Sequence, residues 1–127
     1  MTVRKKILLV EDDPDIREMM LAFLLSEPFD IVEAATIPSA RQSLSSEGPF
    51  DLAILDFWLG QDHAVSIIDM IRSDEGNTPV IVISGGNDRL DLEATAAIAD
   101  VSGAVTFLQK PFKKVTLLDA VTAALKV

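Results

Sequence analysis

The sequence predicts a single doubly wound α/β domain, and three observations support this prediction. Short apolar runs alternate with segments of helical periodicity along the whole chain, which is the pattern of a parallel sheet with helices on both faces. The runs are apolar throughout rather than alternating in polarity, as expected for strands that are buried on both faces. The length of 127 residues suits one domain with its own core.

The first two strands and the helix between them are predicted from apolar spacing and from residues that suit helix ends. Residues 6–10 form the first apolar run. Pro14 is typical of a first helical turn, and Asp13 before it is a suitable cap. The helix stops before Pro28, and residues 29–34 form the second strand. One apolar stripe runs along this helix, formed by Ile16, Met19, Met20, Phe23 and Leu24.

The remaining elements continue the same alternation of strand and helix. In chain order they are predicted at residues 39–46 (helix), 51–56 (strand), 63–73 (helix), 79–84 (strand), 88–102 (helix), 104–109 (strand) and 112–126 (helix). Apolar residues at helical spacing support the third and the last helix. In the last helix the residues predicted to share one apolar face are Val115, Leu118, Val121 and Leu125.

Composition excludes several classes of function. The net charge of −9 argues against a nucleic-acid-binding surface, because such a surface needs a basic patch. The absence of cysteine excludes disulfides, thiolate metal sites and cysteine nucleophiles. No apolar stretch is long enough to span a bilayer, and none has the form of a signal peptide. A cytoplasmic protein is therefore expected.

Charged and hydroxyl residues stand where four of the predicted strands end. They are Glu11, Asp12 and Asp13 after the first strand, Asp56 at the third, Ser84 at the fourth and Lys110 after the fifth. The carboxyl ends of parallel strands lie along one edge of a sheet, where ligands bind, so these side chains are expected to converge. The pattern predicts a cation site beside a candidate nucleophile.

These strand-end motifs resemble those of the receiver domain of bacterial two-component response regulators. The similar segments are ILLVEDDP at 7–14, LD at 55–56, ISG at 83–85 and QKPF at 109–112. Their order along the chain is specific, and the resemblance covers nearly all of it. It implies a flavodoxin-like fold, a five-stranded parallel sheet in strand order 2-1-3-4-5 with helices on both faces. It also implies that residues 1–127 form one receiver domain, with no output domain in this chain.

The resemblance implies a chemical role for each strand-end residue. Asp56 is the expected phosphoacceptor, since a carboxylate can attack phosphorus and form an acyl phosphate. Lys110 is expected to supply counter-charge to the phosphoryl oxygens, and Ser84 a hydroxyl that bonds one of them. Ser84 and Phe107 together are expected to switch the face formed by the fourth helix, fifth strand and fifth helix. The Lys110-Pro111 peptide is expected to be cis.

A magnesium ion is the cofactor that the resemblance implies. Its expected ligands are Glu11, Asp12 and Asp56 together with the backbone carbonyl of Trp58. Magnesium prefers oxygen ligands and retains several waters, so a small carboxylate set is sufficient. Asp12 is expected to bind directly and Glu11 through water, whereas Asp13 caps the helix.

The expected partners follow from this chemistry. A sensor histidine kinase or a histidine phosphotransfer protein would donate the phosphoryl group, and a downstream protein or an output domain outside this chain would read the switch. A homodimer is a further expectation; direct contact with nucleic acid and insertion into a membrane are not expected. The chain would catalyse only its own phosphorylation and dephosphorylation, so it is not expected to be a turnover enzyme.

Three other functions were weighed against this one. A haloacid-dehalogenase-type phosphatase needs a second aspartate two residues after the nucleophile, where this chain has Trp58. A flavodoxin-like flavin binder needs a phosphate cradle after the first strand, but the acidic residues 11–13 would repel a phosphate. A pseudo-receiver that is not phosphorylated and acts as a protein-interaction module is the main alternative. It is disfavoured because every reacting group is present.

Two departures from the family pattern lie after Asp56. Receivers usually carry a proline four residues after the acceptor and a glycine eight residues after it, where this chain has Gly60 and Ala64. The loop that follows the acceptor is therefore expected to be looser than usual. His63 is the only histidine, and it is interpreted as a loop or helix-cap residue.

Overall fold

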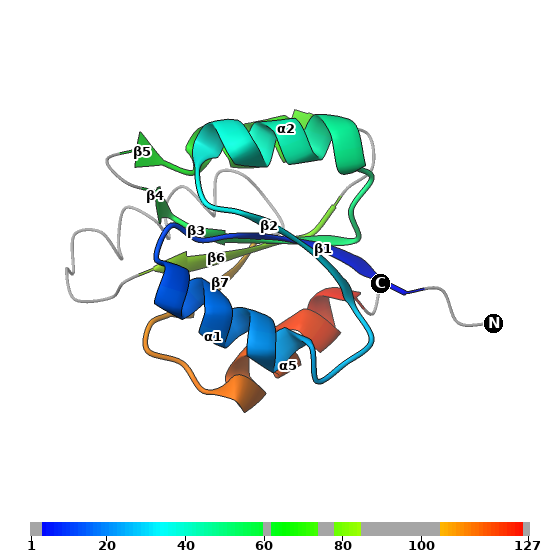
Figure 1. Cartoon of the computed structure of the whole chain (residues 1–127), viewed down its shortest axis with the longest axis vertical. Helices are drawn as coiled ribbons and strands as arrows, with labels where there is room; N and C mark the ends of the chain where they lie inside the picture. Colours follow the sequence, from blue (N-terminus) through cyan, green and yellow to red (C-terminus); the bar gives the residue numbers. More distant parts are fainter. Residues whose placement is uncertain (1–3, 60–61, 74–77, 85–104, 126–127) are drawn as a thin grey trace.

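Five parallel strands form the central sheet of the computed structural model, which describes residues 4–59, 62–73, 78–84 and 105–125 (Figure 1). They are β1 (Lys6–Val10), β2 (Asp30–Ala34), β3 (Leu52–Asp56), β6 (Val80–Ser84) and β7 (Val105–Gln109). Their order across the sheet is β2-β1-β3-β6-β7, and every pair is parallel. This is the predicted order 2-1-3-4-5, so the fold class is confirmed.

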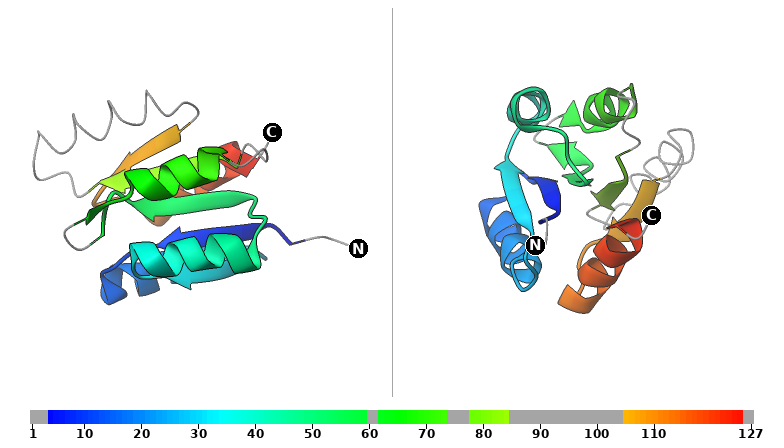
Figure 2. Two further views of the ribbon diagram at one scale, coloured as in Figure 1. Left: turned by 90° about the horizontal axis from the view of Figure 1, so that it is seen from above. Right: turned by 90° about the vertical axis from the view of Figure 1, so that its right-hand side faces the viewer.

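Among the described residues, two helices cover each face of the sheet (Figure 2). On one face lie α1 (Pro14–Leu24) and α5 (Lys114–Leu125), and on the other lie α2 (Ile37–Glu47) and α3 (Val65–Ser73). The predicted helix at 88–102 lies outside the described residues. In the described part of the chain, none of the helices has both the length and the apolar character needed to cross a bilayer.

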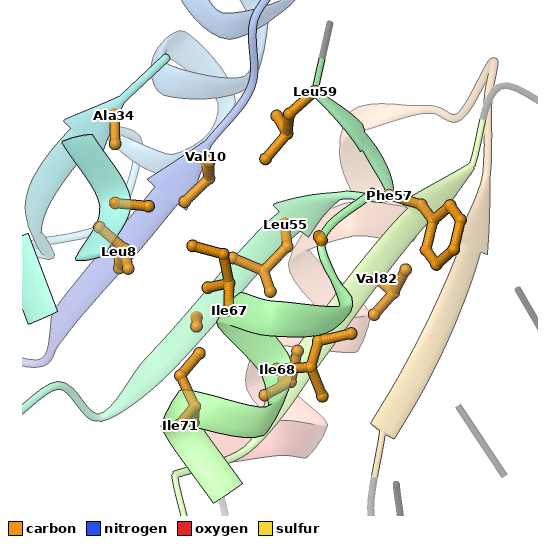
Figure 3. Packing of buried hydrophobic residues seen from close by; sticks show 14 of the residues in the cluster. Leu8, Val10, Ala34, Leu55, Phe57, Leu59, Ile67, Ile68, Ile71 and Val82 are labelled. Carbon is orange, nitrogen blue, oxygen red and sulfur yellow. The ribbon is translucent and has the colours of Figure 1, made fainter. Parts of the chain in front are cut away.

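Alternate residues of each strand point into two separate apolar clusters. On the α2/α3 face, Ile67, Ile68 and Ile71 of α3 pack over Leu55 and Val82 of the sheet (Figure 3). On the α1/α5 face, the intervening strand residues pack against residues of both helices, namely Met20, Leu24, Leu117 and Val121. Because the strands are buried on both sides, the sheet edge at their carboxyl ends is held in a fixed position.

Two apolar residues that were predicted to face the core are exposed instead. Met19 in α1 is 39% exposed, and Val115 in α5 is 59% exposed. Each lies at the margin of its stripe, and only a narrow part of each helix contacts the sheet. In α5 the buried pair is Leu117 and Val121, four residues apart. The prediction for the cap of α1 is confirmed, because the Asp13 carboxylate accepts hydrogen bonds from two backbone amides of the first turn.

The segment after Asp56 differs from the prediction. Two short strands, β4 (Trp58–Leu59) and β5 (Asp62–His63), form an antiparallel pair in which Trp58 is opposite His63. His63 therefore belongs to a strand, not to a loop or a helix cap, and α3 begins at Val65 rather than at residue 63. The backbone N–H of Ala64 donates to the Phe57 carbonyl at 2.8 Å, which closes the segment at its base. Backbone pairing thus holds residues 58–59 against residues 62–63.

Candidate functional site

The site lies at the carboxyl edge of the sheet, where β1, β3 and β7 end. Glu11 and Asp12 follow β1 directly, Asp56 is the last residue of β3, and Lys110 follows β7. One oxygen from each of the three carboxylates lies within 4.8 Å of the others. The structure therefore brings together four of the five charged groups that were predicted to converge.

Lys110 bridges the two most buried carboxylates. Its ammonium nitrogen lies 2.7 Å from Oε1 of Glu11 and 3.3 Å from Oδ2 of Asp56. The side chains of Glu11 and Asp56 are 1% and 10% exposed. The Lys110-Pro111 peptide is cis, as predicted. Both ion pairs are thus held in a largely water-excluded position.

The ionisation of Glu11 reflects this burial. Desolvation raises the pKa of its carboxyl from 4.5 to about 8, the nearby Asp56 carboxylate adds to the effect, and Lys110 opposes it. Burial alone would lower the pKa of Lys110, but its hydrogen bond to Glu11 and the charge of Asp56 raise it overall. The Lys110 side chain is therefore charged at neutral pH. Its single positive charge does not balance the negative charge of the neighbouring carboxylates.

The residues present fit a small hard cation. Three carboxylates share the site with one ammonium. The second oxygen of Glu11, Oε2, is buried and has no hydrogen-bond partner among the described residues. A buried carboxylate oxygen that lacks a donor is costly unless a cation or water satisfies it. Magnesium and calcium are the ions that prefer such oxygen ligands.

The third acidic residue of the β1–α1 loop does not join this cluster. Oδ1 of Asp13 accepts hydrogen bonds from the backbone N–H groups of Asp15 and Ile16, at 2.9 and 3.3 Å. It is therefore committed to capping α1, as predicted. Asp12 beside it is exposed and contributes an oxygen to the acidic cluster.

The two predicted switch residues stand on neighbouring strands. Ser84 ends β6 and pairs with Gln109 of β7, the residue before Lys110. Its side chain lies outside the described part of the structure. Phe107 is half-buried on β7 and packs against the α2/α3 cluster, which includes Phe57. Phe57, which follows the candidate acceptor Asp56, therefore belongs to the same apolar cluster against which Phe107 packs.

Trp58 lies at the rim of the site, two positions after Asp56. It is 36% exposed, and its ring meets the buried Phe57 ring edge-to-face with 5.2 Å between the centroids. This contact ties the indole to the core.

One residue near the site was missed by the sequence analysis. The guanidinium of Arg17, in α1, donates from Nη1 to the backbone carbonyl of Glu11 at 2.8 Å. Its Nε lies 3.4 Å from Oε1 of Glu33 in β2. The contact with Glu33 depends on the pairing of β1 with β2, so no local pattern could have revealed that contact. The one indication in the sequence was an arginine side chain placed one helical turn after Asp13, the cap of α1.

Comparison with known proteins places this geometry in a family. The family model described as response regulator receiver domain matches residues 7–122. The chain is 32% identical over 127 residues to the DNA-binding response regulator MtrA of Mycolicibacterium smegmatis, covering 98% of this chain and 52% of MtrA. It is 35% identical over 123 residues to the response regulator protein PilR of Pseudomonas aeruginosa, covering 97% of this chain and 26% of PilR. The chain thus spans about half the length of MtrA and less of PilR.

Solved structures resemble this chain over nearly its full length. The signal receiver domain of a putative LuxO repressor protein from Vibrio parahaemolyticus has a TM-score of 0.82 at 29% identity, covering 98% of this chain and 92% of that one. The beryllofluoride-activated NtrC4 receiver domain dimer has a TM-score of 0.81 at 30% identity, covering 95% of this chain and 96% of that one. The second of these was solved as a dimer.

Proposed function

Because this chain belongs to the response regulator receiver domain family, whose members are the phosphoacceptor modules of two-component signalling, we propose that Asp56 is the residue that accepts the phosphoryl group. Asp56 lies at the end of a central strand, and 10% of its side chain is exposed, so one edge of the carboxylate can meet a donor. The donor would be the phosphohistidine of a sensor kinase or of a histidine phosphotransfer protein.

The proposed transfer forms one bond and breaks one. A carboxylate oxygen of Asp56 bonds to phosphorus, and the phosphorus–nitrogen bond of the donor histidine breaks. The histidine nitrogen keeps the electron pair, and Asp56 becomes an acyl phosphate. The difficulty is that an anion attacks an anion, so positive charge near the reacting groups is required.

Lys110 provides part of that charge from its place between Glu11 and Asp56. Its ammonium is 3.3 Å from Asp56 Oδ2. It is therefore close enough to contact an oxygen of a phosphoryl group attached to Asp56. Ser84 would supply a hydroxyl to another phosphoryl oxygen, since its strand position is adjacent to the residue before Lys110.

Glu11, Asp12 and Asp56 would hold a magnesium ion, with the backbone carbonyl of Trp58 as a further ligand. The buried, unpartnered Oε2 of Glu11 and the excess of carboxylates over ammonium groups support this choice. When bound, magnesium would supply positive charge beside the carboxylates and the incoming phosphoryl oxygens. We assign Asp12 as a direct ligand because its side chain is exposed, and Glu11 as a ligand through water.

The output of the reaction would be a change at Ser84 and Phe107. Phosphorylation makes Asp56 more negative and adds strong acceptors, which would draw Ser84 toward them. Phe107 would then move toward the vacated space and alter the surface that β7 and α5 contribute to, where a downstream partner or output domain binds. A second copy of this chain is a further candidate partner, because the similar NtrC4 receiver forms a dimer.

The wider setting follows from the family. We propose that residues 1–127 constitute one receiver domain, that it acts in the cytoplasm, and that its catalysis is limited to its own phosphorylation and dephosphorylation. The net charge of −9 supports partners that are proteins rather than nucleic acids.

One observation carries the proposal: Asp56 shares a closed cluster with Glu11, Asp12 and Lys110. The test is incubation with acetyl phosphate, with and without magnesium, followed by intact-mass measurement. Wild type should gain one phosphoryl group only with magnesium. Asp56→Asn should gain none, and Asp69→Asn, which changes an exposed aspartate of α3, should behave as wild type. Labelling of Asp56→Asn at the wild-type level would contradict the assignment, and an unlabelled wild type would favour a pseudo-receiver.

A further inference from the structure

The peptide that joins Glu11 to Asp12 is fixed from outside the acidic cluster. Its carbonyl oxygen, that of Glu11, accepts a hydrogen bond from Nη1 of Arg17 at 2.8 Å. The N–H of Glu11, on the preceding peptide, donates to the carbonyl of Ala34 in β2 at 3.1 Å. Backbone groups beyond the end of a strand have no ladder partner, so these two bonds determine how the loop leaves the sheet.

This peptide determines where two of the acidic groups point. The carboxylates of Glu11 and Asp12 branch from the alpha carbons on its two sides. A change in the ψ torsion of Glu11 would turn this peptide and displace Asp12 relative to Glu11, so it would change the separation of the two carboxylates. The cluster has oxygens of Glu11, Asp12 and Asp56 within 4.8 Å of one another, an arrangement that such a rotation would break.

Arg17 is itself held by a second residue. Its Nε is 3.4 Å from Oε1 of Glu33 in β2, and the guanidinium side chain is 23% exposed. The same side chain borders a hollow of about 210 Å³ that is also lined by Glu33 and Ser39. Because the guanidinium is not enclosed by packing on that side, its position depends on its two polar contacts. An arginine suits this task because its planar fork can donate in two directions at once.

We propose that Arg17 is a positioning residue of the acidic site, which sets magnesium affinity by fixing the Glu11–Asp12 peptide. This inference rests on the proposed function, since it takes the acidic cluster to be a magnesium site. Arg17 touches none of the reacting atoms and acts through the backbone of Glu11. Groups that orient metal ligands in this way typically change metal affinity by about 10- to 100-fold when they are removed.

Electrostatics alone predicts that removing the Arg17 charge strengthens magnesium binding, whereas the proposed positioning role predicts that it weakens magnesium binding. The two roles can therefore be distinguished by experiment. Removing a positive charge near a cation site should strengthen the binding of a cation, because one repulsive term is lost. Loss of positioning should weaken it. The direction of the change in Arg17→Met therefore separates the two roles, and the hollow beside the side chain leaves room for methionine.

The experiment measures magnesium affinity by calorimetry for wild type, Arg17→Met, Arg17→Lys and Arg41→Met. Arg17→Met should bind magnesium about tenfold more weakly than wild type. Arg17→Lys keeps the charge but can reach only one of the two partners, so its loss should be smaller. Arg41 is an exposed residue of α2, and Arg41→Met is the control for the charge change. It should bind magnesium as wild type does.

A second readout needs no metal. In magnesium-free protein, the amide ¹⁵N chemical shift of Asp12 should change in Arg17→Met, because this nitrogen belongs to the peptide that Arg17 binds. It should not change in Arg41→Met. At saturating magnesium, phosphorylation of Arg17→Met by acetyl phosphate should return close to the wild-type extent, since Asp56 itself is untouched.

Two results would overturn the inference while leaving the proposed function intact. One is wild-type magnesium affinity in Arg17→Met, and the other is an equal weakening in Arg41→Met. A wild-type protein that binds no magnesium would overturn the inference and the proposed metal site together. Should Arg17→Met fail to fold, Arg17→Lys decides the question, because an affinity equal to that of wild type would contradict the role of the guanidinium fork.

Discussion

The carboxylate of Glu11 and the ammonium of Lys110 are in contact at 2.7 Å, although 99 positions of sequence separate them. Glu11 is 1% exposed, so this ion pair is shielded from water. The same ammonium lies 3.3 Å from Asp56. One lysine thus joins the end of β7 to the ends of β1 and β3, and several properties of the site depend on it.

We expect Lys110→Met to destabilise the metal-free protein by about 3 kcal/mol, because removing one partner leaves buried carboxylates without their counter-charge. Urea unfolding in the presence of a chelator measures this loss. Added magnesium should restore part of it, since a bound cation offsets the same charge. Lys113→Met, at an exposed position nearby, is the matched control and should change little. Equal stabilities for the two variants would show that Lys110 does not hold the cluster together.

The raised pKa of Glu11 predicts that the metal-free protein loses stability as the pH rises. The pKa is about 8 in the folded chain and 4.5 for the free group, so between these values the folded state holds a proton that the unfolded state has released. The stability that this retained proton contributes is fully present below pH 4.5 and is lost by pH 8 and above. Between these values the free energy of unfolding falls by at most about 1.4 kcal/mol per pH unit.

Urea unfolding from pH 5 to 9, with a chelator present, tests the prediction when wild type is compared with Glu11→Gln. The glutamine variant keeps the shape of the side chain but cannot titrate. Titrating groups remote from Glu11 are common to both proteins and cancel in the difference. A difference in stability that stays constant across the range would contradict the raised pKa.

Ser84→Ala should still be phosphorylated but should lose most of its conformational response. The reason is that the hydroxyl would couple the phosphoryl oxygens to the movement of Phe107, whereas Asp56, Lys110 and the acidic groups would carry the proposed transfer itself. NMR shift changes in β7 and α5 on addition of beryllofluoride or acetyl phosphate report the response. Ser45→Ala, at an exposed site in α2, should respond fully. If Ser84→Ala showed the wild-type shift changes, the coupling would have to run through another group.

Trp58→Ala should dephosphorylate faster than wild type without losing its capacity to be phosphorylated. The indole stands at the rim two residues after Asp56 and rests edge-to-face on Phe57, where it can obstruct a water approaching the phosphorus. An obstruction worth about 1.4 kcal/mol of barrier corresponds to a roughly tenfold change in rate. Decay of the phosphorylated protein after donor removal gives the rate. Trp58→Phe retains an aromatic ring, so its dephosphorylation rate should lie between those of wild type and Trp58→Ala. An unchanged rate in Trp58→Ala would show that the indole only covers the rim of the site.

The strands and the convergence of their ends could be predicted because they depend on local signals. An apolar run such as 52–55 is typical of a strand buried on both faces of a parallel sheet, and Asp56 at its end then lies at the carboxyl edge. The cap at Asp13 is equally local, since it needs only a carboxylate before Pro14. The chemical roles assigned to Asp56 and Lys110 came from the resemblance to receivers.

Features that depend on tertiary contacts could not be predicted in this way. The exposure of Met19 and Val115 reflects how narrow a strip of each helix meets the sheet, and periodicity does not report that width. The β4–β5 pair has two residues in each strand, too few for a periodic signal. The bond from Arg17 to the Glu11 carbonyl joins residues only six positions apart but belongs to no recognisable motif, and the contact of the same guanidinium with Glu33 exists only once β1 and β2 have paired.

The spread of the site along the chain has a consequence during synthesis. Glu11 and Asp12 leave the ribosome first, Asp56 follows, and Lys110 emerges only when the last strand is already made. A nascent or truncated chain that lacks β7 therefore carries the acidic groups without the ammonium that bridges them. Such a fragment should be a poor phosphoacceptor. On the proposed function, phosphorylation would therefore require a chain in which β1 and β7 have met in one sheet.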